Sequence, residues 1–233
     1  MSTSYAAQFD AHCAELKAIA DCGLVGFPNA GKSTLLSAIS TCQPRIAPYP
    51  FTTMHPLVGK IQDLFGNVCE VADLPGLIEG AYENRGLGHQ FLRHVERTQV
   101  IAYVVDMSDC YLTSDRDKAQ QPWEVVETLQ QELEYYQPGL SDRATMVFCT
   151  KMDKPVDSLG QSTQEKFLEL KRMLPDEVQC FPVSALEAHS TGGTVDRGGG
   201  LMAAVNFLCK DVFARKAAAR EEERVQRQTD DRE

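Results

Sequence analysis

Nine consecutive residues, Gly26 to Thr34, have the spacing of a phosphate-binding loop. Their sequence, GFPNAGKST, fits the pattern G-x-x-x-x-G-K-[ST], in which glycines let the backbone curl so that consecutive amides face an anion. The Lys32 ammonium can reach the β- and γ-phosphates of a nucleotide, and the Ser33 hydroxyl is a hard oxygen suited to Mg²⁺. These residue types predict a nucleotide-phosphate site rather than an ordinary glycine-rich turn.

A second motif, Asp73-Leu74-Pro75-Gly76, follows an apolar strand-like run. A carboxylate that emerges from a buried strand beside a phosphate loop can hold Mg²⁺, directly or through water. Gly76 can bring its backbone amide close to a γ-phosphate, because no side chain stands in the way. Alone, D-x-x-G more often marks a turn, but the upstream phosphate loop favours the nucleotide site.

The sequence Thr150-Lys151-Met152-Asp153 follows another apolar run and suits recognition of a base. The Asp153 carboxylate can accept hydrogen bonds from the N1–H and the exocyclic amine of guanine. Adenine lacks this donor pair and would leave a buried charge unpaired, at a cost of roughly several kcal/mol. Lys151 can pack its stem over the base. The alternative is a solvated Lys-Asp pair at a strand end.

Two further short segments are weaker candidates on their own. Backbone amides of Ser184, Ala185 and Leu186, after the last expected strand, could meet the base oxygen. Thr53, in the segment Phe51-Thr52-Thr53, could complete Mg²⁺ coordination only when a γ-phosphate is present, which would make that segment a nucleotide-state switch. The alternative is that these threonines merely begin a strand.

The elements that must hold these motifs alternate between buried strands and amphipathic helices. We expect strands at 21–25, 57–61, 67–73, 100–106, 145–149 and 178–183, and helices at 5–20, 32–40, 90–97, 123–136, 164–173 and 201–214. The three prolines in 41–53 predict a loop. This order predicts a doubly wound α/β fold, with a mostly parallel six-stranded sheet and one antiparallel edge strand.

Composition and charge limit the possible functions. A net charge of −10 argues against a nucleic-acid clamp, so no DNA partner is expected. The sequence has no run of 18 apolar residues, which predicts no membrane span. Eight scattered cysteines without a C-x-x-C pair indicate small buried side chains in a reducing compartment. We expect an intracellular, monomeric protein that is not secreted.

Four blocks of the sequence resemble the Obg family of GTPases. They are GFPNAGKST at 26–34, YPFTT at 49–53, DLPGLIEGA at 73–81 and RGLGHQFLRHVERT at 85–98, within a resemblance that covers about residues 20 to 190. The resemblance implies a Ras-type GTP-binding domain, expected at 20–214, between an N-terminal extension at 1–19 and a charged, fraying tail at 215–233. It also implies a partner, the large ribosomal subunit, and a location in the cytoplasm or the mitochondrial matrix.

The resemblance further implies roles for individual residues. Those expected on the phosphates are Gly26, Phe27, Pro28, Asn29, Ala30, Gly31, Lys32, Ser33, Thr34, Asp73, Leu74, Pro75 and Gly76. Those expected on Mg²⁺ or in its switch segment are Ser33, Asp73, Phe51, Thr52 and Thr53. Those expected on guanine are Thr150, Lys151, Asp153, Ser184, Ala185 and Leu186.

Hydrolysis by this site is expected to be slow. Leu77 stands where Ras-type enzymes carry a water-orienting glutamine, so intrinsic turnover should be on the order of 10⁻⁴ to 10⁻² s⁻¹. Asn29 resembles the asparagine that coordinates K⁺ in cation-activated relatives. The expected catalytic residues are therefore Asn29, Lys32, Thr53 and Gly76, with Mg²⁺ and GTP or GDP as cofactors and K⁺ as an activator. The alternative is a GTP/GDP sensor with negligible intrinsic hydrolysis.

Three features depart from the family's pattern or remain open. Thr150 stands where the family usually has asparagine, and the sequence lacks the glycine-rich N-terminal domain typical of the family. Arg85, His89, Arg93, His94 and Arg97 form a basic stretch, which is either a solvated helix face or a ribosomal contact.

Overall fold

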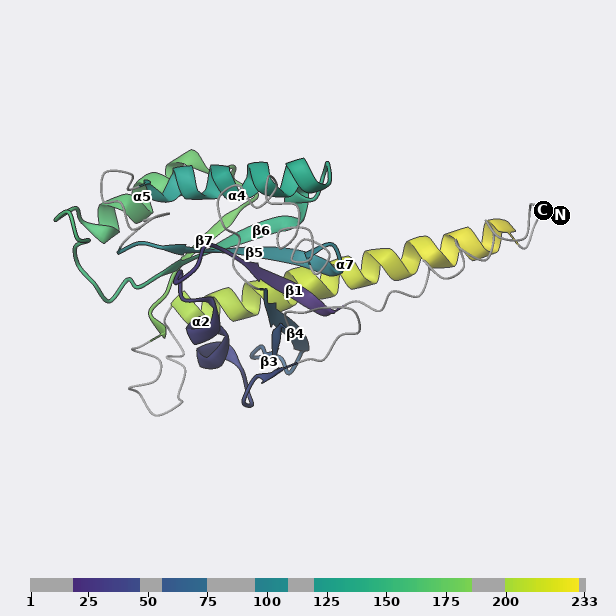
Figure 1. Cartoon of the computed structure of the whole chain (residues 1–233). Helices are drawn as coiled ribbons and strands as arrows, with labels where there is room; N and C mark the ends of the chain where they lie inside the picture. The colour runs from purple at the N-terminus through teal and green to yellow at the C-terminus, as the bar shows by residue number, and fades with distance from the viewer. Residues whose placement is uncertain (1–18, 47–55, 75–94, 109–119, 186–199, 231–233) are drawn as a thin grey trace.

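The computed structural model describes residues 19–46, 56–74, 95–108, 120–185 and 200–230 (Figure 1). Most of the expected helices at 5–20 and 90–97 therefore lies outside the described residues. Ala20, expected at the end of the first helix, instead begins strand β1, and Val95 of the second is helical and buried in the core.

The described strands form one seven-stranded sheet in the order β2-β3-β4-β1-β5-β6-β7. Their bounds are β1 Ala20–Val25, β2 Arg45–Ile46, β3 Leu57–Gln62, β4 Val68–Asp73, β5 Thr98–Asp106, β6 Ala144–Thr150 and β7 Gln179–Pro182. From β4 to β7 all neighbours are parallel, whereas β3 is antiparallel to both β2 and β4. The predicted α/β fold with a mostly parallel sheet is confirmed.

The expected strand count of six was wrong by one edge strand. The additional strand β2 contains only Arg45 and Ile46, which pair with Val58 and Leu57 of β3. It lies within the proline-rich segment where we expected a loop. Two residues are too short to show a periodic pattern, and this strand exists only through its pairing with β3. The antiparallel strand β3 is therefore one position in from the edge.

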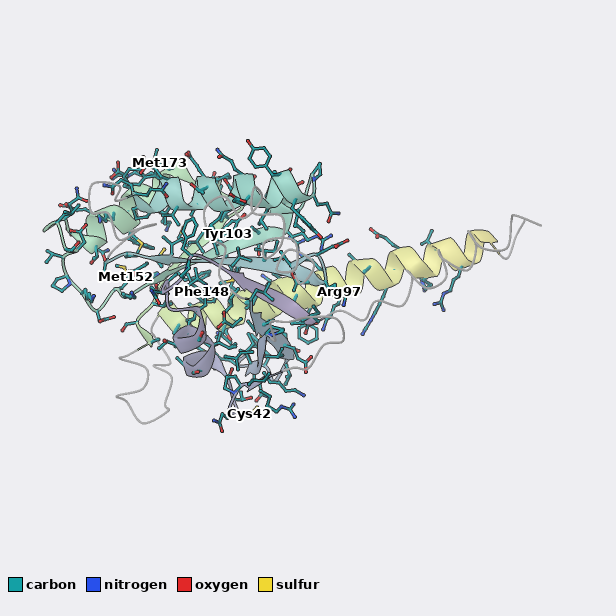
Figure 2. All side chains as sticks on the ribbon, in the orientation of Figure 1. Cys42, Arg97, Tyr103, Phe148, Met152 and Met173 are labelled. Carbon is teal, nitrogen blue, oxygen red and sulfur yellow. The ribbon has the colours of Figure 1, made fainter. Side chains whose placement is uncertain are left out.

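Helices cover both faces of the sheet (Figure 1). Their bounds are α2 Lys32–Ile39, α4 Pro122–Tyr136, α5 Thr163–Met173 and α7 Gly200–Asp230. Buried side chains of α4 and α5 share one core cluster with Tyr103, and those of α2 and α7 share the other with Phe148. Figure 2 shows these two aromatic residues on opposite sides of the sheet. The near-continuous apolar run of β5 is explained, because its alternate side chains enter the two cores.

The last helix is longer than its apolar pattern suggested. Leu201, Leu208 and Val212 of α7 are buried against the sheet, but the helix continues to Asp230 and projects away from the other elements (Figure 1). An ion pair of 2.6 Å between Lys216 Nζ and Asp21 Oδ1 holds it to β1 where it leaves the sheet. We expected a charged tail that frays from residue 215, and the described part of it is helical.

The described cysteines are mostly buried, as expected for small apolar side chains. Cys22, Cys69, Cys149 and Cys209 are buried, whereas Cys42 is exposed. Within the described ranges, no helix combines the length and apolar character that crossing a membrane requires.

Candidate nucleotide-binding site

The phosphate loop lies between the end of β1 and the start of α2. A Cβ atom at Gly26 would lie 2.4 Å from the backbone oxygen of Val104, so only glycine allows the loop to pass β5 at this point. Gly31 and Asn29 have positive φ angles of 93° and 63°, which curl the backbone between them. The loop therefore leads directly into the N-terminus of α2, the geometry that suits an anion.

Lys32 lies inside this loop. Its Nζ donates hydrogen bonds to the backbone oxygens of Gly26 and Phe27, at 2.8 and 3.0 Å, and its side chain is buried. Burial lowers the pKa of Lys32, and the nearby Asp73 carboxylate opposes that effect. The ammonium is thus confined where the phosphates of a nucleotide could replace the two carbonyls as its partners.

Ser33 and Asp73 form the expected pair of hard oxygen atoms. The Ser33 hydroxyl donates a hydrogen bond to Oδ2 of Asp73, which joins the start of α2 to the end of β4. Burial raises the pKa of Asp73, although the hydrogen bond from Ser33 and the charge of Lys32 both lower it. A buried carboxylate that lacks full charge compensation next to a hydroxyl fits a divalent cation, and Mg²⁺ prefers such oxygen ligands.

We expect Mg²⁺ to bind the nucleotide complex less tightly as the pH falls. Protons compete with the metal for Asp73, and its raised pKa moves this competition to a higher pH than for an ordinary aspartate. The same raised pKa means that Asp73 adds stability to the metal-free fold as the pH falls, not as it rises. Mg²⁺ titrations from about pH 5 to 8 would measure the effect. A wild-type affinity as independent of pH as that of Asp73→Asn would contradict it.

The two segments expected to contact the base lie side by side. Ser184 Oγ donates a hydrogen bond of 2.8 Å to Oδ1 of Asp153, and the backbone N–H of Met152 donates to the oxygen of Val183 at 3.3 Å. Asp153 therefore has a fixed orientation at the end of β6, with its second carboxylate oxygen, Oδ2, not involved in the bond to Ser184.

Asp106 is a site residue that the sequence analysis missed. Lys151, in a left-handed conformation with φ 60°, places its Nζ 2.5 Å from Oδ2 of Asp106 at the end of β5. The other carboxylate oxygen of Asp106 accepts hydrogen bonds from the backbone N–H and hydroxyl of Ser108, both 2.8 Å. This arrangement fixes the stem of Lys151. The sequence could have predicted this role of Asp106, because Asp106 ends a buried apolar strand as Asp73 does.

Thr150 joins the base side of the site to the phosphate loop. Its buried hydroxyl is 2.7 Å from the backbone oxygen of Ala30 and 3.1 Å from that of Val105. A hydroxyl has one proton to donate, and both of these neighbours are acceptors. Thr150, which we expected on guanine, thus uses its donor on the protein backbone.

Several predicted site residues cannot be placed. Phe51, Thr52, Thr53, Pro75, Gly76, Leu77 and Leu186 lie outside the described residues, as do Arg85, His89, Arg93 and His94 of the basic stretch. Their roles remain predictions. The structure brings together the phosphate loop, Asp73, Thr150, Asp153 and Ser184 at the carboxyl ends of the parallel strands, the edge at which doubly wound sheets bind ligands.

Comparison with known proteins agrees with this geometry. Residues 21–151 match the family model described as 50S ribosome-binding GTPase. The chain is 49% identical over 174 residues to "Probable GTP-binding protein OBGM, mitochondrial" of Oryza sativa subsp. japonica, covering 74% of this chain and 31% of the rice protein. It is 46% identical over 172 residues to "GTPase Obg" of Bacillus licheniformis, covering 74% of this chain and 37% of that protein. The chain thus spans about a third of these relatives.

Solved structures confirm the fold at much lower sequence identity. The G domain of the T. maritima FeoB iron transporter superposes with a TM-score of 0.55 at 18% identity, over 82% of this chain and 96% of that one. A structure described as nucleolar GTP-binding protein 1 of Plasmodium falciparum gives a TM-score of 0.54 at 18% identity, over 92% of this chain and 98% of that one. At such identities the likeness concerns the fold alone.

Proposed function

Because this chain belongs to the Obg family of GTPases, we propose that it is a Mg²⁺-dependent protein that binds GTP and hydrolyses it slowly. We further propose that its nucleotide state switches a role in assembly of the large ribosomal subunit. The observation that carries the proposal is the convergence of three groups at one edge of the sheet. They are the loop around Lys32, the Ser33–Asp73 pair and the Asp153–Ser184 pair.

Each of these groups has a distinct task in the proposed reaction. Lys32 and the loop amides stabilise the charge on the phosphates, and a Mg²⁺ ion held at Ser33 and Asp73 would neutralise charge that develops on the β- and γ-oxygens. Asp153 selects guanine, while Lys151 covers the base plane. The proposal of slow intrinsic turnover rests on Leu77, which stands where Ras-type enzymes carry a water-orienting glutamine.

The ribosomal role is supported by the relatives rather than by a surface of this chain. The matching family model is described by binding to the 50S subunit, and the protein relatives carry an Obg-type GTPase name. A bacterial-type cytoplasm or a mitochondrial matrix would both suit this role, since the relatives include an organellar protein.

Single-turnover GTP hydrolysis with and without large ribosomal subunits tests this function. We expect slow hydrolysis by the protein alone, no hydrolysis without Mg²⁺, and faster turnover or nucleotide-dependent binding with the subunits. GTP binding without hydrolysis under any of these conditions would instead support a GTP/GDP sensor. Failure to bind either guanine nucleotide would overturn both functions.

We expect K⁺ to accelerate hydrolysis through Asn29. Its left-handed conformation, with φ 63°, places it at the curled part of the phosphate loop. A monovalent cation held there would supply positive charge near the phosphates that no described side chain other than Lys32 provides. Rates in KCl and NaCl at matched ionic strength measure the effect, and Asn29→Ala should remove the difference. Equal wild-type rates in the two salts would exclude this role.

A further inference from the structure

The segment 154–162, which links Asp153 to α5, is bound tightly to the first turn of that helix. The Thr163 hydroxyl donates a hydrogen bond of 2.6 Å to the backbone oxygen of Lys154, and the Thr163 N–H donates one of 3.2 Å to the oxygen of Pro155. The peptide group between Lys154 and Pro155, one residue beyond the one that follows Asp153 directly, is therefore anchored to α5 rather than left as a surface turn.

A buried ion pair holds the middle of the same segment. Lys166 of α5 contacts Asp157, and their side chains are only 8% and 3% exposed. The other oxygen of Asp157 accepts the backbone N–H groups of Leu159 and Gln161, both at 2.8 Å. Burial alone would raise the pKa of Asp157, but the hydrogen bonds from Lys166 and these N–H groups together hold it below its usual range.

A buried ion pair is not required to stabilise a segment of this kind. Burying two charges is costly even when they pair, and well-packed apolar residues often stabilise a fold equally well. The best-attested use of a buried ion pair is to select one conformation among several. Here the conformation selected is that of the segment leaving Asp153.

We propose that Thr163 and Lys166 are positioning residues for guanine recognition, which they serve by fixing the orientation of the Asp153 carboxylate. This inference rests on the proposed function, in which Asp153 reads the guanine edge. Ser184 fixes Oδ1 of that carboxylate, and the anchored carbonyl of Lys154 fixes the backbone one residue further along. Two parallel hydrogen bonds to a base tolerate displacements of only about 0.5 Å or 10–20°. Release of the segment should therefore weaken base reading before it weakens phosphate binding.

Affinity for GDP compared with IDP tests the proposal, because hypoxanthine lacks the exocyclic amine that the second bond requires. The wild type should prefer GDP on the order of 10- to 100-fold, the effect of a hydrogen bond to a charged group. Thr163→Val keeps the side-chain shape and removes the hydroxyl, and Lys166→Met removes the charge. Each should reduce GDP affinity roughly five- to tenfold and IDP affinity by less, because hypoxanthine makes only the N1–H bond to Asp153, so the preference shrinks. In the Asp153→Asn background neither should have a further effect.

Thr128→Val is the matched control, because the Thr128 hydroxyl also donates to a backbone oxygen, that of Glu124 at 2.8 Å, but on α4. It should leave the preference for GDP unchanged. Equal losses of GDP and IDP affinity in Thr163→Val, or no loss, would overturn the proposal, and this mild variant gives the answer even if Lys166→Met does not fold. A wild type without preference for GDP over IDP would instead refute the assignment of Asp153, and the inference with it.

Discussion

Replacing Lys32 with methionine should lower the affinity for both GTP and GDP roughly 100- to 1,000-fold. Removing one charged partner from a buried, hydrogen-bonded contact typically costs about 2–5 kcal/mol. The methionine side chain keeps most of the apolar stem, so the loop around Gly26 and Phe27 loses the two hydrogen bonds from Nζ but little packing. Titration with a fluorescent GDP analogue measures the affinity directly.

Lys60→Met is the control for this substitution. Lys60, unlike the buried Lys32, has a side chain that is 44% exposed, and it forms an ion pair with Glu70 on the neighbouring strand. An exposed pair of this kind contributes at most about 1 kcal/mol to stability. Nucleotide affinity should therefore be unchanged in Lys60→Met. Retained GDP affinity in Lys32→Met, in a protein with a normal melting temperature, would show that the loop does not bind phosphates as we propose.

Replacing Asp153 with asparagine should lower GTP affinity roughly 100-fold or more and raise the affinity for xanthosine triphosphate. The amide of asparagine cannot accept both hydrogen bonds from guanine, whereas it can donate to the carbonyl that xanthine carries in place of the amine. Sites that hydrogen-bond a substrate group discriminate strongly against analogues that leave buried polar atoms unpaired. Competition of GTP, XTP and ATP against a labelled nucleotide would measure the change.

The change of preference from GTP to XTP is the decisive part of this result. ATP should bind weakly to both proteins, because adenine offers neither the donor pair for Asp153 nor the carbonyl for asparagine. Ser184 can still donate to the asparagine oxygen, so the side chain should keep its orientation. If GTP and XTP affinity fell together in Asp153→Asn, the substitution would have disturbed the segment without reversing base recognition, and Asp153 would not be the selector.

Much of the fold could be predicted because its strands are strongly apolar and its motifs are local. The run that became β5 indicated a strand buried on both faces, and its alternate residues do enter the two cores. The strand β2 could not be predicted in the same way, because Arg45 and Ile46 have no pattern of their own and are exposed. Their conformation comes from pairing with β3, which is a tertiary effect.

The candidate site shows the same division. Residue type and spacing were enough to predict that Lys32, Ser33 and Asp73 meet, since the ends of adjacent parallel strands and the following loop share one edge. The contacts of Thr163 and Lys166 could not be predicted, because their partners lie in a segment with no regular element. Thr150 was expected on guanine, and only the structure shows that backbone carbonyls of the protein lie within reach of its proton.

The length of α7 gives the domain a lever arm. Its described helix has 31 residues, and the part from 215 to 230 extends about 24 Å at 1.5 Å per residue. The buried part of the helix begins where Gly200 passes close to the backbone of Pro182 and ends at the ion pair of Lys216 with Asp21. A tilt of about 10° at the sheet would move the tip near Asp230 by about 4 Å. Any tilt of α7 against the sheet would therefore be amplified at its far end.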